Sequence, residues 1–250
     1  MIKIAIVGCT GKLGSAIMRN AMRSADVEVC YAIARKGNQF VGKNVSELID
    51  CKSDLLIIDD IELANDCDIY IDCTNAEAFM NNSYSKYEKM QKPLIIATTA
   101  FSVEDIEKIN LLSTKFPVFM SGNFSVALHD FIETIKFYAS KISLDTNIQI
   151  VEYHHNQKKD APSGTALMIK DALLNTNNSI NSDKVTICSV RAGNIFGEHE
   201  VIFANCKDEV VTFKHQVSSK EPFADGAIEV SKWIIKQTCG LYNMDDFCNV

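Results

Sequence analysis

The sequence lacks the features that define several large protein classes. Its nine cysteines are scattered, odd in number and without a C-x-x-C pair, which argues against both a disulfide framework and a zinc ribbon. Most lie in apolar surroundings, as Cys73 does, so we interpret them as small core residues of a protein in a reducing compartment. No apolar run approaches the roughly 20 residues that a membrane-spanning helix needs.

An excess of positive charge is also absent. The formal net charge of -7 argues against a nucleic-acid partner, because neutralising phosphates requires a basic face. Residues 1–8 contain one lysine and a short apolar run that ends at glycine, which is not the pattern of a secretory signal. Since 47% of the residues are hydrophobic, the chain can bury a core. We therefore expect a globular, cytoplasmic protein with no membrane partner.

Short apolar runs alternate with helical segments over the first 123 residues. The β-branched run 2–7 leads into a glycine-rich turn and then into residues 15–24, whose apolar side chains recur at helical spacing. Further strand-like runs follow at 27–34, 55–58, 69–72, 94–98 and 118–120. This alternation predicts an α/β domain with a Rossmann-like, doubly wound parallel sheet.

A different pattern begins after Asn123. Helices are expected at 126–142 and 164–174, and strands at 147–153, 185–193, 199–206 and 208–217. The last three strands alternate in polarity and are expected to be antiparallel. The sequence thus predicts a second α+β domain, 124–222, with a mostly antiparallel mixed sheet. The segment 223–250, with a helix at 223–237, is expected to complete the dinucleotide-binding domain 1–123, with the site between the two domains.

Three glycines follow the first strand-like run. Gly8, Gly11 and Gly14 form G-x-x-G-x-x-G, which differs from the commoner G-x-G-x-x-G because Thr10 occupies the second glycine position. Between a strand and a helix, such a turn presents main-chain amides to a pyrophosphate at the helix N-terminus. We interpret it as a dinucleotide-binding turn, and a tight turn without a ligand is the alternative.

Ala34, Arg35 and Lys36 end the second strand-like run, at the place where the cofactor is selected. A carboxylate there binds the ribose hydroxyls of NAD, whereas basic groups suit the phosphate of NADP. The missing carboxylate and the two basic residues predict NADPH as the preferred cofactor, with NADH as the second possibility. A solvated charge pair in a loop is the alternative interpretation.

The segment 152–166, EYHHNQKKDAPSGTA, contains the densest group of reactive side chains. Two imidazoles, two ammonium groups and a Ser-Gly-Thr turn that opens a helix together suit the binding of carboxylates. These residues are His154, His155, Lys158, Lys159, Ser163, Gly164 and Thr165. A protonated lysine also supplies the proton that completes reduction of an imine. Zinc is the competing idea, but adjacent histidines without a cysteine or a nearby carboxylate pair seldom both reach one ion.

On these motifs, the sequence resembles the dihydrodipicolinate reductase family. The family signature, approximately E-x-H-H-x-x-K-x-D-x-P-S-G-T-A, is matched at every fixed position of residues 152–166. The resemblance runs over nearly the whole chain, through IDCTNAEAF at 71–79, ATTAF at 97–101, GNFSVAL at 122–128, VRAGNIFGEH at 190–199, and FADGAIEVSKWI with GLYNM near the end.

The resemblance implies roles for individual residues. It places the pyrophosphate against Gly8, Cys9, Thr10, Gly11, Lys12 and Leu13, and the adenosine ribose beside Arg35. It places the nicotinamide side near Ala97, Thr98, Thr99, Ser121, Gly122, Asn123 and Phe124. It assigns proton donation to His154 and Lys158, and substrate carboxylate binding to His155, Gly164 and Thr165, to which we add Ser163 of the same turn. We favour Lys158 as the donor, because lysine is charged at neutral pH without an environmental shift.

Two positions depart from the family pattern. The family usually has G-T-T-G where this chain has ATTA at 97–100, so two methyl groups lie where the main chain approaches the nicotinamide. It commonly has an acidic residue at the position of Ala34, and the absence of that residue favours NADPH. The resemblance also implies a homotetramer formed through the sheet of the second domain.

These observations predict an oxidoreductase that transfers a hydride from NAD(P)H to a cyclic dicarboxylate imine. The resemblance implies reduction of 4-hydroxy-tetrahydrodipicolinate (dihydrodipicolinate) to tetrahydrodipicolinate, in the diaminopimelate route of lysine biosynthesis. No metal is implied. Two alternatives stay open, a reductase of another imino or keto acid and a non-catalytic NADP-binding sensor on the same fold.

Overall fold

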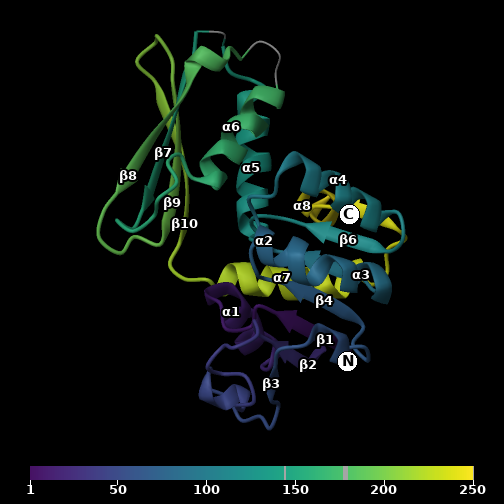
Figure 1. Cartoon of the computed structure of the whole chain (residues 1–250). Helices are drawn as coiled ribbons and strands as arrows, with labels where there is room; N and C mark the ends of the chain where they lie inside the picture. Colours follow the sequence, from purple (N-terminus) through teal and green to yellow (C-terminus); the bar gives the residue numbers. More distant parts are fainter. Residues whose placement is uncertain (144, 177–179, 250) are drawn as a thin grey trace. The chain divides into compact units, whose positions relative to one another are not determined.

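The computed structural model of the protein describes residues 1–143, 145–176 and 180–249, and the chain divides into two compact units (Figure 1). Unit 1 contains Met1–Ser125 and Lys220–Val250, and unit 2 contains Val126–Ser219. The C-terminal segment therefore folds with the N-terminal half of the chain rather than with the residues that directly precede it.

Unit 1 is built on a seven-stranded sheet in which all neighbouring strands are parallel. The strands are β1 (Ile2–Val7), β2 (Val27–Ile33), β3 (Ile57–Ile58), β4 (Ile69–Asp72), β5 (Leu94–Ile96), β6 (Pro117–Met120) and β11 (Gly240–Tyr242). They lie in the order β11-β6-β5-β4-β1-β2-β3. The predicted Rossmann-like parallel sheet is confirmed, and β11 is a further strand that the sequence pattern did not indicate.

Helices cover both faces of this sheet. They are α1 (Lys12–Ala21), α2 (Ala76–Ala78), α3 (Tyr84–Met90), α4 (Val103–Ser113), α7 (Glu221–Ile234) and α8 (Met244–Cys248), with a π-helical turn at Phe79–Ser83 and 3-10 turns at Val45–Glu47 and Ile61–Leu63. Ile4 and Ile6 of β1 share a core with α1 and α7, whereas Ala5 and Val7 share a core with α3 and α4. Because both faces are buried, the strand is apolar from Ile4 to Val7.

The strand order reverses between β1 and β4. The chain places β2 and β3 on one side of β1, and β4, β5 and β6 on the other. The C-terminal ends of β1 and β4 are adjacent, since the amide of Cys73 donates to the carbonyl of Val7 at 2.8 Å. In open parallel sheets, ligands bind beside the carboxyl ends of the strands at such a reversal.

Unit 2 has one four-stranded mixed sheet packed against two helices. Its elements are α5 (Val126–Ala139), β7 (Asn147–His154), α6 (Gly164–Thr176), a 3-10 turn at Ser182–Lys184, β8 (Val185–Arg191), β9 (Gly197–Ala204) and β10 (Val210–Val217). The mixed sheet is confirmed, but the expected direction of β8 was wrong, because β8 is parallel to β7 whereas β9 is antiparallel to β7 and β10. Helix α6 connects β7 to β8, and a crossover of this kind returns the chain in the same direction.

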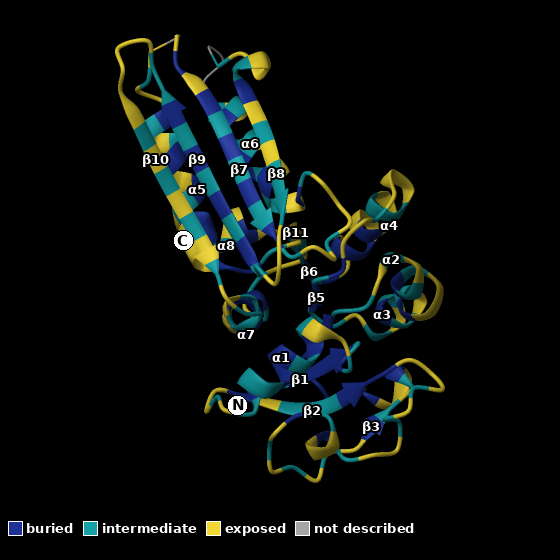
Figure 2. Cartoon of the chain, turned by 90° about the vertical axis from the view of Figure 1, so that its left-hand side faces the viewer, coloured by how far each residue is buried: buried dark blue, intermediate teal, exposed yellow. Residues whose placement is uncertain are grey.

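One face of the unit 2 sheet forms a core with α5 and α6, and burial alternates along its strands (Figure 2). The inward residues of the two central strands are first apolar, namely Ile148, Ile150, Val201 and Phe203. Toward the end of β7 the inward row becomes polar, with Glu152 and His154, and His199 of β9 pairs in register with Glu152. The strand period of two thus buries these polar side chains together.

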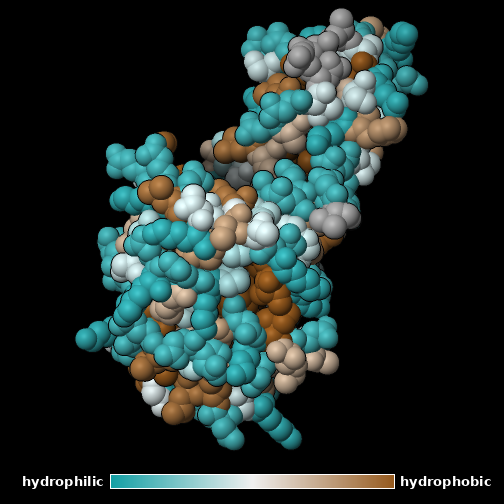
Figure 3. Space-filling view, turned by 90° about the vertical axis from the view of Figure 1, so that its right-hand side faces the viewer, coloured by the Kyte–Doolittle hydropathy of each residue, from teal (hydrophilic) through white to brown (hydrophobic). Residues whose placement is uncertain are grey.

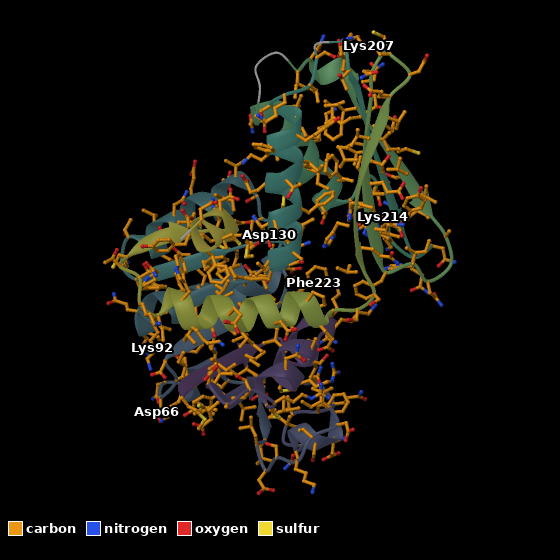
Figure 4. All side chains as sticks on the ribbon, turned by 180° about the vertical axis from the view of Figure 1, so that it is seen from behind. Asp66, Lys92, Asp130, Lys207, Lys214 and Phe223 are labelled. Atoms are coloured by element: carbon orange, nitrogen blue, oxygen red, sulfur yellow. The ribbon has the colours of Figure 1, made fainter. Side chains whose placement is uncertain are left out.

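The other face of this sheet carries charged side chains. Lys214 of β10, labelled in Figure 4, pairs with Glu200 of β9 at 3.5 Å and also with Glu198. Figure 3 shows the opposite side of the molecule to Figure 2, and on it hydrophilic residues predominate and hydrophobic residues form smaller patches among them. Within the described residues, no helix is long and apolar enough to cross a membrane.

Candidate active site

The glycine turn requires close main-chain packing at the reversal of the unit 1 sheet. Gly8 has φ +83, and a Cβ there would lie 2.9 Å from the main-chain carbonyl of Cys73. A Cβ on Gly14 would lie 2.4 Å from the carbonyl oxygen of Gly8. These contacts leave no space for side chains, so the turn brings the N-terminus of α1 directly beside the ends of β1 and β4. Such a turn fits the pyrophosphate of a dinucleotide.

The basic residues after β2 lie next to this turn. Ala34 is 3% exposed and its amide donates to the carbonyl of Ile58 at 2.9 Å, whereas Arg35 and Lys36 are exposed. The loop is held to the turn by Asn38, whose Nδ2 donates to Oγ1 of Thr10 at 3.3 Å. Two cationic side chains are therefore available beside the turn, while position 34 itself faces the core.

The two predicted nicotinamide-side segments follow β5 and β6, at the same edge of the sheet. The amide of Ala97 donates to the carbonyl of Asp72 at 2.9 Å, and the amide of Ser121 donates to the carbonyl of Ile96 at 3.2 Å. Ala100 has φ +64, in the left-handed region that favours glycine, at a position where the family usually has glycine. Ala100 therefore keeps the left-handed conformation despite its methyl group, at a cost on the order of 1 kcal/mol.

The predicted cofactor residues are exposed, partly buried or buried. Gly11, Lys12, Thr99 and Gly122 are exposed, and Thr10, Leu13, Ala97, Ser121 and Asn123 are partly buried. The side chains of Cys9 and Phe124 belong to the core, at 0% and 1% exposure, and that of Thr98 is 3% exposed. These three residues are therefore almost inaccessible, and the exposed and partly buried residues are the ones available to a ligand.

In unit 2, the carboxylate of Glu152 is bound from three elements. Arg191 of β8 contacts both oxygens, with Nη2 2.7 Å from Oε1 and Nη1 2.8 Å from Oε2. His154, two residues along β7, bonds to Oε2 through Nδ1. The amide of Ser163, at the start of α6, donates to Oε1 at 3.2 Å. Glu152 is fully buried, and such a charge is stable only with this number of donors.

These contacts determine the charges at the site. Burial favours the neutral acid, but hydrogen bonds from Arg191 and His154 outweigh burial and lower the pKa of Glu152 to about 2. Burial also lowers the pKa of His154, although Glu152 opposes the change. At neutral pH, His154 is therefore neutral, with the Nδ1 proton donated to Glu152 and an unprotonated Nε2.

The start of α6 is held by the same group of residues. Ser163 Oγ accepts from the amide of Ala166 at 3.1 Å and lies 3.2 Å from Nε2 of His199. Burial lowers the pKa of His199 to about 3, so this imidazole is neutral. Gly164 and Thr165 follow in the first turn of the helix and are less buried than Ser163. Main-chain amides at such a helix start attract anions.

Lys158 lies in the loop between β7 and α6. Its Nζ pairs with Oδ2 of Asp160 at 2.8 Å, and its side chain is 22% exposed. The amide of Lys158 donates to the carbonyl of His155 at 3.1 Å, and Nη2 of Arg191 donates to the carbonyl of Asp160 at 2.7 Å. Arg191 therefore binds both the carboxylate of Glu152 and the main chain of this loop.

Sequence reasoning missed the residues that organise the site. Glu152 belongs to the quoted motif but received no role, and Arg191 and His199 come from strands that lie far along the chain. The available signal was the spacing of Glu152 and His154, because residues two apart in a strand share a face. In the described part of the chain, no group of three or more His, Cys, Asp or Glu residues is arranged to hold a metal ion.

The parallel sheet with its glycine turn, together with the cationic and imidazole cluster of unit 2, defines a nicotinamide-dependent oxidoreductase of two α/β units. The chain belongs to the dihydrodipicolinate reductase family, as expected from its motifs. Residues 2–124 match the N-terminal part of that family and residues 126–248 match its C-terminal part.

Relatives named 4-hydroxy-tetrahydrodipicolinate reductase match nearly the full chain. The protein from Buchnera aphidicola subsp. Acyrthosiphon pisum (strain Tuc7) is 34% identical, covering 98% of this chain and 97% of its own length. The protein from Caldanaerobacter subterraneus subsp. tengcongensis is 35% identical, covering 98% of each chain. A solved structure of dipicolinate-bound dihydrodipicolinate reductase from Paenisporosarcina sp. TG-14 has a TM-score of 0.75, covers 97% of each chain and is 19% identical, which supports the fold.

Glu152→Gln should destabilise the protein by about 3 kcal/mol near neutral pH, because it leaves the guanidinium of Arg191 without its buried anion. The pKa of Glu152 is lowered from 4.5 to about 2. The ionised carboxylate therefore makes its full contribution to the free energy of unfolding above pH about 4.5, and this contribution is lost as pH falls toward 2. Denaturant unfolding of wild type and variant across this range measures the difference. A constant difference down to pH 2 would contradict the assigned charge, and Glu133→Gln, an exposed carboxylate on α5, is the control.

Proposed function

We propose that this chain is an NADPH-dependent 4-hydroxy-tetrahydrodipicolinate reductase. It reduces the cyclic dicarboxylate imine to tetrahydrodipicolinate, in the diaminopimelate route of lysine biosynthesis. The observation that carries the proposal is the full-length family match together with the motif at 152–166, in which Glu152 binds the imidazole of His154 and the amide of Ser163 at the start of α6. A cytoplasmic location and a small-molecule substrate follow from this assignment.

Unit 1 would hold the cofactor. The close packing of Gly8 and Gly14 supports a pyrophosphate at the start of α1, and the exposed Arg35 and Lys36 support the 2′-phosphate of NADPH. The loops at 97–99 and 121–124 would lie on the nicotinamide side. When bound, NADPH supplies the hydride.

Unit 2 would hold the two substrate carboxylates. Gly164 and Thr165 offer amides at the start of α6, and His155 and Ser163 adjoin them on either side of the Lys158 loop. A structure with this fold has been solved with dipicolinate bound, a planar ring with the same two carboxylates. The amides at the start of α6 and the ammonium of Lys158 would therefore bind a dianion and also stabilise electron density that develops on the ring during reduction.

Lys158 would deliver the proton. His154 is neutral at neutral pH and its Nδ1 proton is donated to Glu152, so its Nε2 has no proton to transfer. The ammonium of Lys158 pairs with the carboxylate of Asp160 at 2.8 Å, and Lys158 lies in the loop that leads to Ser163. In this arrangement His154 accepts a hydrogen bond and orients the ring or the ammonium, while Lys158 acts as the general acid.

Unit 2 would also form the contacts of a homotetramer. The sheet face that carries Glu198, Glu200 and Lys214 is the face opposite the core of α5 and α6, so it is available to a second copy. The homotetramer is inferred from the family resemblance. The sheet face opposite α5 and α6 supports this inference, because a second copy of the chain could pack against it.

Purified protein should oxidise NADPH only when freshly made 4-hydroxy-tetrahydrodipicolinate is present, with a kcat/KM at least about tenfold higher for NADPH than for NADH. A charge-assisted contact to the 2′-phosphate contributes about 1.5–3 kcal/mol, which corresponds to that preference. Arg35→Ala with Lys36→Ala should remove the preference, whereas Arg23→Ala, an exposed arginine in the turn after α1, should retain it. Steady-state absorbance kinetics with both cofactors give these values.

Equal or better kcat/KM with NADH would refute the NADPH assignment. Turnover of another imino or keto acid alone would favour a different reductase, and NADPH binding without turnover of any such substrate would favour the sensor.

Lys158→Ala should lower kcat by roughly 10²- to 10⁴-fold, the usual scale for loss of a general acid, with the affinity for NADPH unchanged. The control is Lys207→Ala, an exposed lysine in the turn between β9 and β10 of the same unit. If Lys158 only holds a carboxylate, the loss falls on KM and His154→Ala shows the larger defect in kcat. Near-normal kcat in Lys158→Ala would exclude lysine as the acid.

A further inference from the structure

Unit 1 contains a buried carboxylate that the proposed function has not used. Asp72 is the last residue of β4, is 0% exposed, and lies at the reversal of the sheet, where the next residue bonds to the end of β1. A carboxylate at this place is unusual, because burial of a charge is unfavourable unless it is compensated.

Four hydrogen bonds hold Asp72, and all come from neutral groups. Oδ1 accepts from the amide of Thr74 at 2.9 Å, from Oγ1 of Thr74 at 2.6 Å and from Oγ1 of Thr98 at 3.1 Å. Oδ2 accepts from the hydroxyl of Tyr87 at 2.7 Å. Within the described residues, no Lys, Arg or His forms an ion pair with Asp72, in contrast to Glu152, which has Arg191.

These partners fit an ionised carboxylate. An ionised aspartate only accepts hydrogen bonds, and the four groups around Asp72 can all donate. The pKa of Asp72 is raised above its ordinary value, because burial outweighs the hydrogen bonds from Thr74, Tyr87 and Thr98. Against this, four donors lie within 3.1 Å of the carboxylate, and the main-chain amide of Thr74 can only donate, which favours the ionised form. A negative charge without a cationic partner keeps its field in surroundings of low dielectric, so it acts on other charges near that edge of the sheet.

The segment that contains α3 places the hydroxyl of Tyr87 next to this carboxylate. A π-helical turn at Phe79–Ser83 directly precedes α3, and the first full turn of α3 then brings Tyr87, 1% exposed, against Oδ2. Single π turns of this kind are frequent at functional sites. Thr98, the other side-chain donor from a separate element, belongs to the segment proposed for the nicotinamide side.

We infer that Asp72 tunes the binding of the two redox states of the cofactor. Its uncompensated negative charge stabilises the cationic ring of NADP⁺ over the neutral ring of NADPH, and through Thr98 it positions the loop after β5. The inference rests on the proposed function. It makes Asp72 an electrostatic and positioning residue that favours the development of positive charge as the hydride leaves.

The test compares dissociation constants for NADPH and NADP⁺ in wild type, Asp72→Asn and Tyr87→Phe, by calorimetry or fluorescence. NADPH and NADP⁺ share every phosphate, so only the ring charge differs. Asp72→Asn should raise the ratio Kd(NADP⁺)/Kd(NADPH) by about tenfold, as expected for loss of one charge at short range. Tyr87→Phe removes one donor and keeps the charge, so its ratio should stay within about twofold of wild type.

Equal weakening of both cofactors in Asp72→Asn would overturn the inference and leave only a structural role. Wild-type protein that binds neither cofactor would instead overturn the proposed function. Should Asp72→Asn not fold, the pKa of Asp72 in the wild-type protein is measured by carbon-13 NMR of labelled aspartate, assigned through Tyr87→Phe. By linkage, that pKa should be about one unit lower with NADP⁺ than with NADPH, and equal values would overturn the inference.

Discussion

The buried contact between Glu152 and Arg191 is the interaction on which the unit 2 site depends. Removing a carboxylate from water is costly, so this one is stable only when a guanidinium and several further donors replace the solvent. Those donors come from β7, β8 and the start of α6, and they meet only in the folded sheet. The imidazole of His154 and the helix start at Ser163 are therefore oriented by one group rather than separately.

The two units use a buried carboxylate in different ways. Glu152 has a cationic partner, and its charge serves to orient neighbours while its own field is largely cancelled. Asp72 is held by neutral donors alone, so its field is retained at the edge of the sheet where a dinucleotide binds. Both lie at or near the C-terminal end of a strand, because a strand end brings side chains from successive loops together.

Local patterns predicted much of the fold and only part of the site. The parallel sheet followed from apolar runs alternating with helical segments, whereas the direction of β8 depends on the crossover through α6 and has no local signature. The strand end at 34–36 is predicted to select the cofactor, and Ala34 is buried there whereas Arg35 and Lys36 are exposed. Arg191 and Asp72 were missed because their roles arise from contacts between distant strands and loops, which periodicity does not report.

The most direct test of the central claim measures binding of pyridine-2,6-dicarboxylate and of NADPH to wild type, Glu152→Gln and the α5 surface variant Glu133→Gln, under conditions where all three are folded. We expect Glu152→Gln to weaken the dicarboxylate by about tenfold or more, since the helix start and His154 lose their common partner, while NADPH affinity stays within about twofold. Glu133→Gln should match wild type for both ligands. Unchanged dicarboxylate binding in folded Glu152→Gln would contradict the claim that this carboxylate organises the substrate site.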